Sequence, residues 1–168
     1  NWKDLVEDIK LVTEEVATSH FIGSIVLMEE EEEDSLGVFT IIDGQQRVIT
    51  LTLLLSSLMF AFKKRNMINH ANGTKKYLVA IDTKDVEHAI VAPENHLSLT
   101  RIVEGVIAIS PEDAAAMSAV AFSKSKRASG SKDELIVKAF QYFSASFAKM
   151  KDEELLAFRD AVISVAYV

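Results

Sequence analysis

The chain has 168 residues, no cysteine and a net charge of −7. The lack of cysteine excludes disulfide bonds and thiolate metal sites, and the length is sufficient for one domain with a sizeable buried core. Six consecutive acidic residues at positions 29–34 leave the rest of the chain at a net charge of −1. A domain that binds DNA through its own phosphate contacts is usually basic, so the composition disfavours that class of protein.

The first hundred residues are predicted to be a mixed α/β region. Helical spacing of apolar residues predicts an amphipathic helix over residues 2–18. Two apolar strands are predicted over residues 21–28 and 38–42, paired as a hairpin whose long loop holds the exposed acidic run. A helix that is apolar on all sides follows from Gln45 to about Arg65, which indicates burial on more than one face.

Residues 48–62 form the longest apolar window, and they include two threonines and two serines. A helix needs about 20 apolar residues to span a bilayer, so this window predicts a core helix and no membrane contact. Beyond it, residues 69–73 are predicted to be a turn-rich loop, residues 76–82 and 88–92 to be strands, and Leu97 to Leu99 a short extended piece.

The remainder of the chain is predicted to be helical. Ser110 and Pro111 begin a helix that is expected to run to about Phe122. A polar linker then leads to a capping box at Ser131 and Glu134, and the last helix begins near Asp152. We therefore predict an α+β fold, with residues 1–100 as a core and residues 101–168 as a helical extension of the same domain.

The junction between the strand at 38–42 and the long helix is the strongest candidate for a functional site. We refer to Asp43, Gly44, Gln45, Gln46 and Arg47 as the 43–47 junction. The start of a helix has free backbone N–H groups and the positive end of the helix dipole, which favour an anion such as phosphate. An arginine in the first turn opposes the dipole, and a bound anion reverses that penalty. The alternative interpretation is a structural turn followed by a solvated helical turn.

Other candidate sites are weaker. The four histidines, His20, His70, His88 and His96, never recur at a spacing of three or four residues, and we interpret them as surface or loop residues. The acidic run at 29–34 is typical of a solvated loop. The apolar face with Phe140, Phe143 and Phe147 is predicted to be helix core, because a base-stacking platform carries interleaved basic residues. We therefore predict no metal-ligand cluster.

The 43–47 junction also carries a resemblance to a known family. Asp-Gly-Gln-Gln-Arg after a strand that ends Ile41-Ile42, and followed by Thr50-Leu51, resembles the ParB/sulfiredoxin-like domain at the N-terminus of GmrSD-type, modification-dependent restriction endonucleases. The segment Phe-Ile-Gly-Ser-Ile at 21–25 is similar to that family's first strand. The resemblance implies a small mixed sheet packed on the long buried helix.

The resemblance further implies a domain that binds and hydrolyses a nucleoside triphosphate, with a divalent metal such as Mg²⁺, and so gates restriction of modified foreign DNA. Asp43, Gln46 and Arg47 would then be the catalytic residues, and Gly44, Gln45 and Thr50 would contact the nucleotide. DNA would be bound by other modules of a longer cytoplasmic protein, including a C-terminal nuclease module. The first residue is Asn1 rather than Met, which agrees with a piece of such a protein.

Two alternative functions remain open. Ile49 occupies a position where the family commonly has threonine, and no second catalytic group is evident in the chain. These observations favour a non-catalytic interaction or DNA-sensing module in which the 43–47 junction is a structural turn. A ParB-like DNA-binding regulator is the third interpretation, and the acidic balance of the chain disfavours it.

Overall fold

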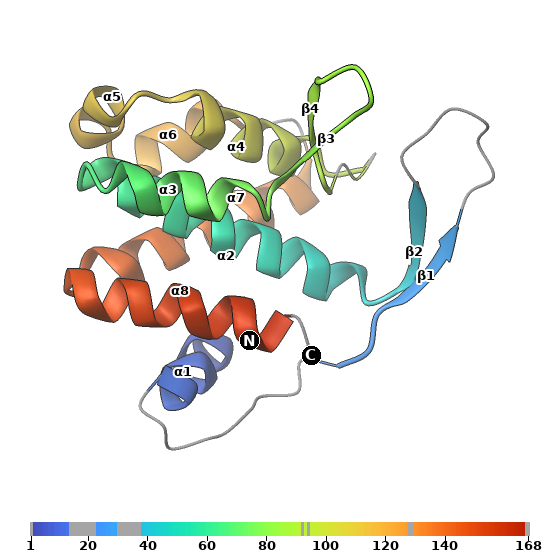
Figure 1. Ribbon diagram of the computed structural model, residues 1–168, viewed down its shortest axis with the longest axis horizontal. Coiled ribbons are helices and arrows are strands. Elements are labelled where there is room, and N and C mark those ends of the chain that lie inside the picture. The colour runs from blue at the N-terminus through green and yellow to red at the C-terminus, as the bar shows by residue number, and fades with distance from the viewer. Residues whose placement is uncertain are drawn as a thin grey trace.

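One long helix, α2, forms the centre of the molecule (Figure 1). The computed structural model describes residues 2–13, 23–29, 38–91, 93, 95–127 and 130–166. Within these ranges the fold is a mostly helical α+β arrangement of eight helices and two small antiparallel sheets. The elements are α1 (Trp2–Thr13), β1 (Val26–Glu29), β2 (Phe39–Asp43), α2 (Gln45–Lys64), α3 (Ile68–Lys75), β3 (Val79–Ile81), β4 (Glu87–Ala89), α4 (Leu97–Ala108), α5 (Pro111–Ala116), α6 (Ala119–Ser125), α7 (Ser131–Ala148) and α8 (Asp152–Ala166).

Helix α2 is buried on most of its circumference, as its sequence predicts. Helices α3, α4, α5 and α7 all contact it, and α6 packs on α7. Figure 1 shows α4, α5 and α6 on one side of α2, and α8 with α1 on the other. Although α2 is long and apolar enough to cross a membrane, 61% of its apolar window is buried inside the protein. The helix is therefore the core helix of this fold.

The hydroxyl groups on the buried part of α2 are satisfied within the helix itself. Thr52, Ser56 and Ser57 each donate to the backbone carbonyl four residues earlier, at 2.7–2.8 Å. An unpaired hydroxyl in an apolar environment is costly, and this local bond removes the cost. Polar residues in the window are therefore compatible with a dry core.

The β1–β2 hairpin corrects the predicted packing of the sheet. The two strands pair antiparallel as expected, with Leu27 opposite Ile41 and a β-bulge next to Val26. The hairpin, however, projects away from the helices (Figure 1), and seven of its large apolar side chains are 39–57% exposed. The prediction of a mixed sheet packed on the long helix is therefore wrong for the described residues, where each sheet has two antiparallel strands. Residues 21, 22 and 30–34 lie outside them.

Two predicted irregular segments are helical. The turn-rich stretch at 69–73 belongs to α3, where Ala71 and Thr74 are fully buried. Leu97 and Leu99 begin α4 rather than an extended piece, and the buried stripe of Leu99, Ile102 and Val106 continues along it. Both helices contact α2, and in α3 this packing outweighs the cost of about 1 kcal/mol that a glycine such as Gly73 carries within a helix.

The second half of the chain follows the predicted helices with two corrections. Ser110 caps α5 as expected, but the helix ends at Ala116, and the Ser118 side chain caps a separate helix, α6. The predicted cap at Ser131 is also wrong, because Gly130 occupies that position. Asp133 accepts a hydrogen bond from the backbone N–H of Ser98 at 3.0 Å instead, so its carboxylate caps α4 from a different helix.

Three basic residues at the end of α2 hold the ends of three other helices. Lys63 Nζ donates to the carbonyls of Ile107 and Ile109 in α4 at 2.7 and 2.8 Å. Lys64 Nζ binds carbonyls at the end of α5, including Met117 at 2.6 Å. Arg65 binds carbonyls at the end of α7 and the Asp152 carboxylate of α8, the latter at 2.8 Å. Cations are favoured at helix C-termini, so this cluster is structural rather than a free basic patch.

Candidate functional site

The 43–47 junction lies where β2 ends and α2 begins, at the exposed base of the projecting hairpin (Figure 1). Gly44 is the N-cap of α2, with φ 91° and ψ 11°. Residues with a side chain rarely adopt this left-handed conformation, so glycine permits the abrupt change from strand to helix. The Asp43 carboxylate accepts a hydrogen bond from the Gly44 N–H at 2.7 Å and so holds the turn.

Two backbone donors remain available at the start of α2. The N–H groups of Arg47 and Val48 both donate to the Gly44 carbonyl, at 3.0 and 3.1 Å. Those of Gln45 and Gln46 have no acceptor within the described part of the chain. Both residues are exposed, so an anion can reach these donors at the positive end of the helix dipole.

The side chains of the junction are partly occupied by bonds within the protein. Gln45 Nε2 donates to the Ile41 carbonyl at 3.1 Å. The Thr50 hydroxyl donates to the Gln46 carbonyl at 2.7 Å, which ties it to its own helix. The side chain of Gln46 is exposed. The structure thus brings the six predicted residues to one place, and Gln45 and Thr50 support the local backbone there.

Arg47 is the one strong charge of the junction that reaches another segment. Its Nη1 donates to the Ser24 carbonyl, 2.7 Å away and 23 residues earlier in the chain. A guanidinium group has five donors, so this bond leaves most of them for a ligand. Arg47 is exposed, which places these donors in contact with solvent.

The backbone that leads into β1 forms part of the site, although we did not predict this from the sequence. Gly23, with φ 92°, lies against the Arg47 guanidinium. Gly44 packs against the Ser24 carbonyl and Ile25. The signal in the sequence is the pair of small residues, Gly23 and Ser24, at the start of an otherwise apolar strand. The contact of these two residues with the 43–47 junction depends on the fold and cannot be seen in the sequence.

The chemistry of the junction suits phosphate better than a bare metal ion. Within the described ranges, no group of three or more histidine, aspartate or glutamate residues is placed to hold a metal. Mg²⁺, however, is commonly held by one or two carboxylates together with substrate phosphates. The exposed Asp43 carboxylate fits that arrangement, and two of its neighbours, Gln46 and Arg47, can donate to phosphate oxygens.

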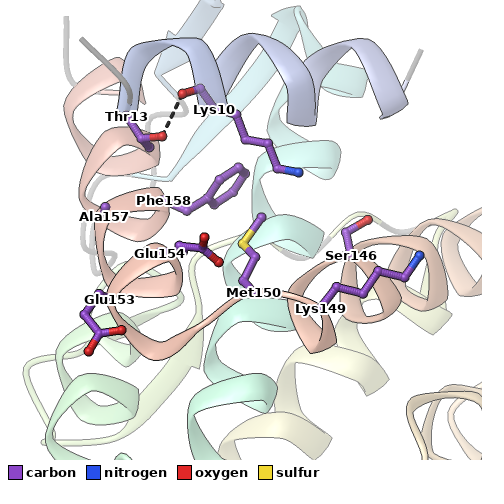
Figure 2. Close-up of a pocket in the computed structure, with 9 residues that line it drawn as sticks. All are labelled: Lys10, Thr13, Ser146, Lys149, Met150, Glu153, Glu154, Ala157 and Phe158. Carbon is purple, nitrogen blue, oxygen red and sulfur yellow. Dashed lines mark hydrogen bonds between the residues drawn. The ribbon is translucent and has the colours of Figure 1, made fainter.

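Two hollows in the helical body are separate from the junction. One, of about 620 Å³, lies where α1 meets α7 and α8 (Figure 2). Its charged lining residues are Lys10, Lys149, Glu153 and Glu154, and Thr13 donates to the Lys10 carbonyl at 2.7 Å. Because its lining carries both positive and negative charges, this hollow has no electrostatic preference for an anion. Another, of about 730 Å³, lies between α4, α5 and α6, and neither includes a junction residue.

The other candidates have mixed outcomes: His88 is an exposed hairpin residue as predicted, whereas His70 is half-buried in α3 with its ring 5.8 Å from that of Phe62, and His96 is half-buried before α4. Phe140, Phe143 and Phe147 are fully buried and belong to the core, as predicted. His88 binds the Asp82 carboxylate of its own hairpin at 2.8 Å. That contact, with the N–H groups of Val86 and Lys84, holds the pKa of Asp82 below its ordinary value. His20 lies outside the described residues.

Comparison with known protein families gives a match over nearly the whole chain. The family model described as the GmrSD restriction endonuclease N-terminal domain matches residues 1–166. No curated protein and no solved structure matches the chain.

Proposed function

This chain belongs to the family of GmrSD restriction endonuclease N-terminal domains, and from that premise we propose that its 43–47 junction binds the phosphates of a nucleoside triphosphate. Binding and hydrolysis there would gate the cutting of modified DNA by the longer endonuclease. The DNA contacts and the nuclease chemistry would reside in other modules, including a C-terminal nuclease. This agrees with the near-neutral balance of the chain outside the acidic run. The site of action would be the cytoplasm, where a restriction enzyme meets foreign DNA.

One observation carries the proposal. Three features occur together at the 43–47 junction: the N–H groups of Gln45 and Gln46, which have no acceptor among the described residues, the positive end of α2 and the exposed Arg47 guanidinium. Each of these groups favours a phosphate oxygen, and their coincidence gives both charge and directional donors. The left-handed Gly44 starts the helix at this point, and its missing side chain leaves room for the Ser24 carbonyl and Ile25 to pack beside these donors.

The residues of the junction have distinct proposed roles. Gln45 and Gln46 would donate backbone N–H groups to the phosphates, and Arg47 would stabilise the charge that develops on the transferred group. Asp43 would hold Mg²⁺ jointly with the phosphates and orient the attacking water. Gln46 would position the same water through its amide side chain. A bound Mg²⁺ would supply neutralisation of phosphate charge.

The test uses the full-length endonuclease and its Arg47→Ala variant. We expect the dissociation constant for inorganic tripolyphosphate, ATP and GTP to rise about tenfold or more, because a hydrogen bond to a charged group contributes roughly 1.5–3 kcal/mol. Nucleotide turnover should fall as well. Arg101→Ala is a matched control, because Arg101 is an exposed arginine on α4 whose bond to Arg127 is long, at 3.4 Å. Equal affinity and turnover in the Arg47→Ala variant and the unmodified enzyme would refute the proposal.

A second candidate function rests on the bonds within the junction. Asp43, Gln45 and Arg47 all bind the protein's own backbone, as expected of a structural turn in an interaction or DNA-sensing module. In that case Arg47→Ala should lower the melting temperature and leave tripolyphosphate affinity and nucleotide turnover unchanged. The same experiment therefore separates the two functions.

A further inference from the structure

Arg47 lies unusually close to the backbone that precedes β1. A Cβ atom placed on Gly23 would be 2.7 Å from both Cζ and Nε of Arg47, and 3.0 Å from its Nη2. Side chains do not tolerate contacts below about 3 Å, since dispersion attraction is optimal at roughly 3.5–4.0 Å. The guanidinium group therefore occupies the space that any other residue at position 23 would fill.

A hydrogen bond fixes the guanidinium group in this place. Its Nη1 donates to the carbonyl of the next residue, Ser24, at 2.7 Å. Nε and Nη2 have no acceptor among the residues that the structure describes. The backbone of Gly23 and Ser24 thus restrains the group through contact and one bond, and leaves other donors for a ligand.

The same short segment also packs on the turn that precedes α2. A Cβ atom on Gly44 would be 3.2 Å from the Ser24 carbonyl oxygen and 3.3 Å from the Ile25 Cα. The two glycines both have positive φ angles, 92° at Gly23 and 91° at Gly44. Two separate stretches of chain are therefore packed together, backbone against backbone, around the free donors of the junction.

We propose that Gly23 and the Ser24 carbonyl position Arg47 for phosphate. This inference rests on the proposed function, because it names the residues that aim a group of that same site. An exposed arginine otherwise samples many rotamers, and ordering them opposes binding. A guanidinium group that the backbone of Gly23 and Ser24 already holds in place loses less conformational entropy when a phosphate binds. Gly23 is a positioning residue and touches no ligand.

The experiment compares Gly23→Ala with Arg47→Ala in the full-length endonuclease, with inorganic tripolyphosphate as the probe. We expect Gly23→Ala to raise the dissociation constant about tenfold, as Arg47→Ala does, because the added methyl group displaces the guanidinium group. The double variant should bind no more weakly than Arg47→Ala alone, since both changes act through one side chain. Gly130→Ala is the control, because Gly130 also has a positive φ, of 135°, while its Cβ would meet its nearest neighbour, Asp133, at an ordinary 3.8 Å.

Each outcome separates this inference from the proposed function. If Arg47→Ala weakens binding and Gly23→Ala does not, the positioning role is refuted and the phosphate site stands. If the two effects add in the double variant, Gly23 acts independently of Arg47 and the inference also fails. If Arg47→Ala itself has no effect, the proposed function fails first.

A second variant keeps the inference testable if Gly23→Ala does not fold. Arg47→Lys retains the charge, but a single ammonium group lacks the fork that binds the Ser24 carbonyl and a phosphate together. We expect its tripolyphosphate affinity to be close to that of Arg47→Ala. Affinity equal to that of the unmodified enzyme would overturn the inference.

Discussion

The two ends of α2 both carry basic side chains, but these side chains have opposite surroundings. At the C-terminal end, Lys63 is only 8% exposed, and it and its two basic neighbours bind carbonyls at the ends of three other helices. At the N-terminal end, Arg47 is exposed and, among the residues that the structure describes, has one bond, to Ser24. The basic side chains at the C-terminal end of α2 are thus bonded to other helices. At the N-terminal end, Arg47 keeps N–H donors that have no acceptor among the described residues.

This difference shows that the position of a basic residue along a helix says more about its role than its charge alone does. Cations at a helix C-terminus complement the dipole of every helix that ends there, so the basic cluster after Phe62 has a sufficient structural reason. Arg47 lies at a helix N-terminus, where the dipole is unfavourable for it. Its bond to the Ser24 carbonyl is a structural compensation for this, and the phosphate of the proposed function would add a second one.

The largest predicted effect is at the C-terminal end. Lys63→Met should lower the free energy of unfolding by about 2–3 kcal/mol, because two half-buried carbonyls lose a charged donor. Burial lowers the pKa of Lys63, so removal of the buried charge recovers part of the loss. Urea unfolding at neutral pH measures the change. Lys138→Met removes only an exposed pair with Glu134 and should cost less than about 0.5 kcal/mol. Equal effects of the two changes would contradict the buried role of Lys63.

An intermediate effect is expected at the N-terminal end. Gly44→Ala forces a side chain into the left-handed region and should cost about 1–2 kcal/mol. Gly73→Ala, within α3, should be neutral or stabilising by up to about 1 kcal/mol, since alanine is the better helix former. Thermal unfolding of both variants compares a turn glycine with a helical one. A Gly44→Ala protein as stable as Gly73→Ala would show that the turn is not constrained.

The smallest effect is expected away from both ends of α2, in the β3–β4 hairpin. Because the pKa of Asp82 is lowered in the folded protein, its contribution to stability is present above the pKa of the unfolded chain. The contribution is lost as the pH falls through the folded pKa. The protection of the Val86 amide, whose N–H binds Asp82 at 2.9 Å, is its exchange rate relative to an unfolded chain at the same pH, and it should therefore fall as Asp82 becomes protonated. Asp82→Asn should flatten this dependence, and an unchanged pH profile in that variant would contradict the assignment.

The sequence predicts the centre of the fold well. The bounds of α2 follow from the Asp43-Gly44 turn at one end and the basic cluster at the other, and the structure places them within a residue of the prediction. The pairing of β1 with β2 and the helix start at Ser110 also follow from local signals. These features depend on residues that are neighbours in the sequence, so they can be predicted from it.

Features that depend on distant partners were not predictable. The role of Lys63 depends on carbonyls 44 and 46 residues away, and α3 is helical because α2 covers it. The apolar strands β1 and β2 were expected to pack on the long helix. The apolar pattern of a strand, however, does not show which other element covers it. The residues of the 43–47 junction are consecutive in the sequence, so their closeness in space was predictable. The contribution of Gly23 required the fold, and the predicted division at residue 100 stays a prediction.

The length of α2 has a mechanical consequence. Twenty residues at 1.5 Å per residue make a rod of about 30 Å, anchored firmly where Lys63 and its neighbours clamp the surrounding helices. A rod fixed at one end transmits the orientation of the whole body to its other end without bending. The start of the rod can therefore shift relative to the body only by breaking the core. The hairpin that precedes Gly44 lies beyond the end of this rod, and the Arg47–Ser24 bond ties the segment that leads into β1 to the first turn of α2.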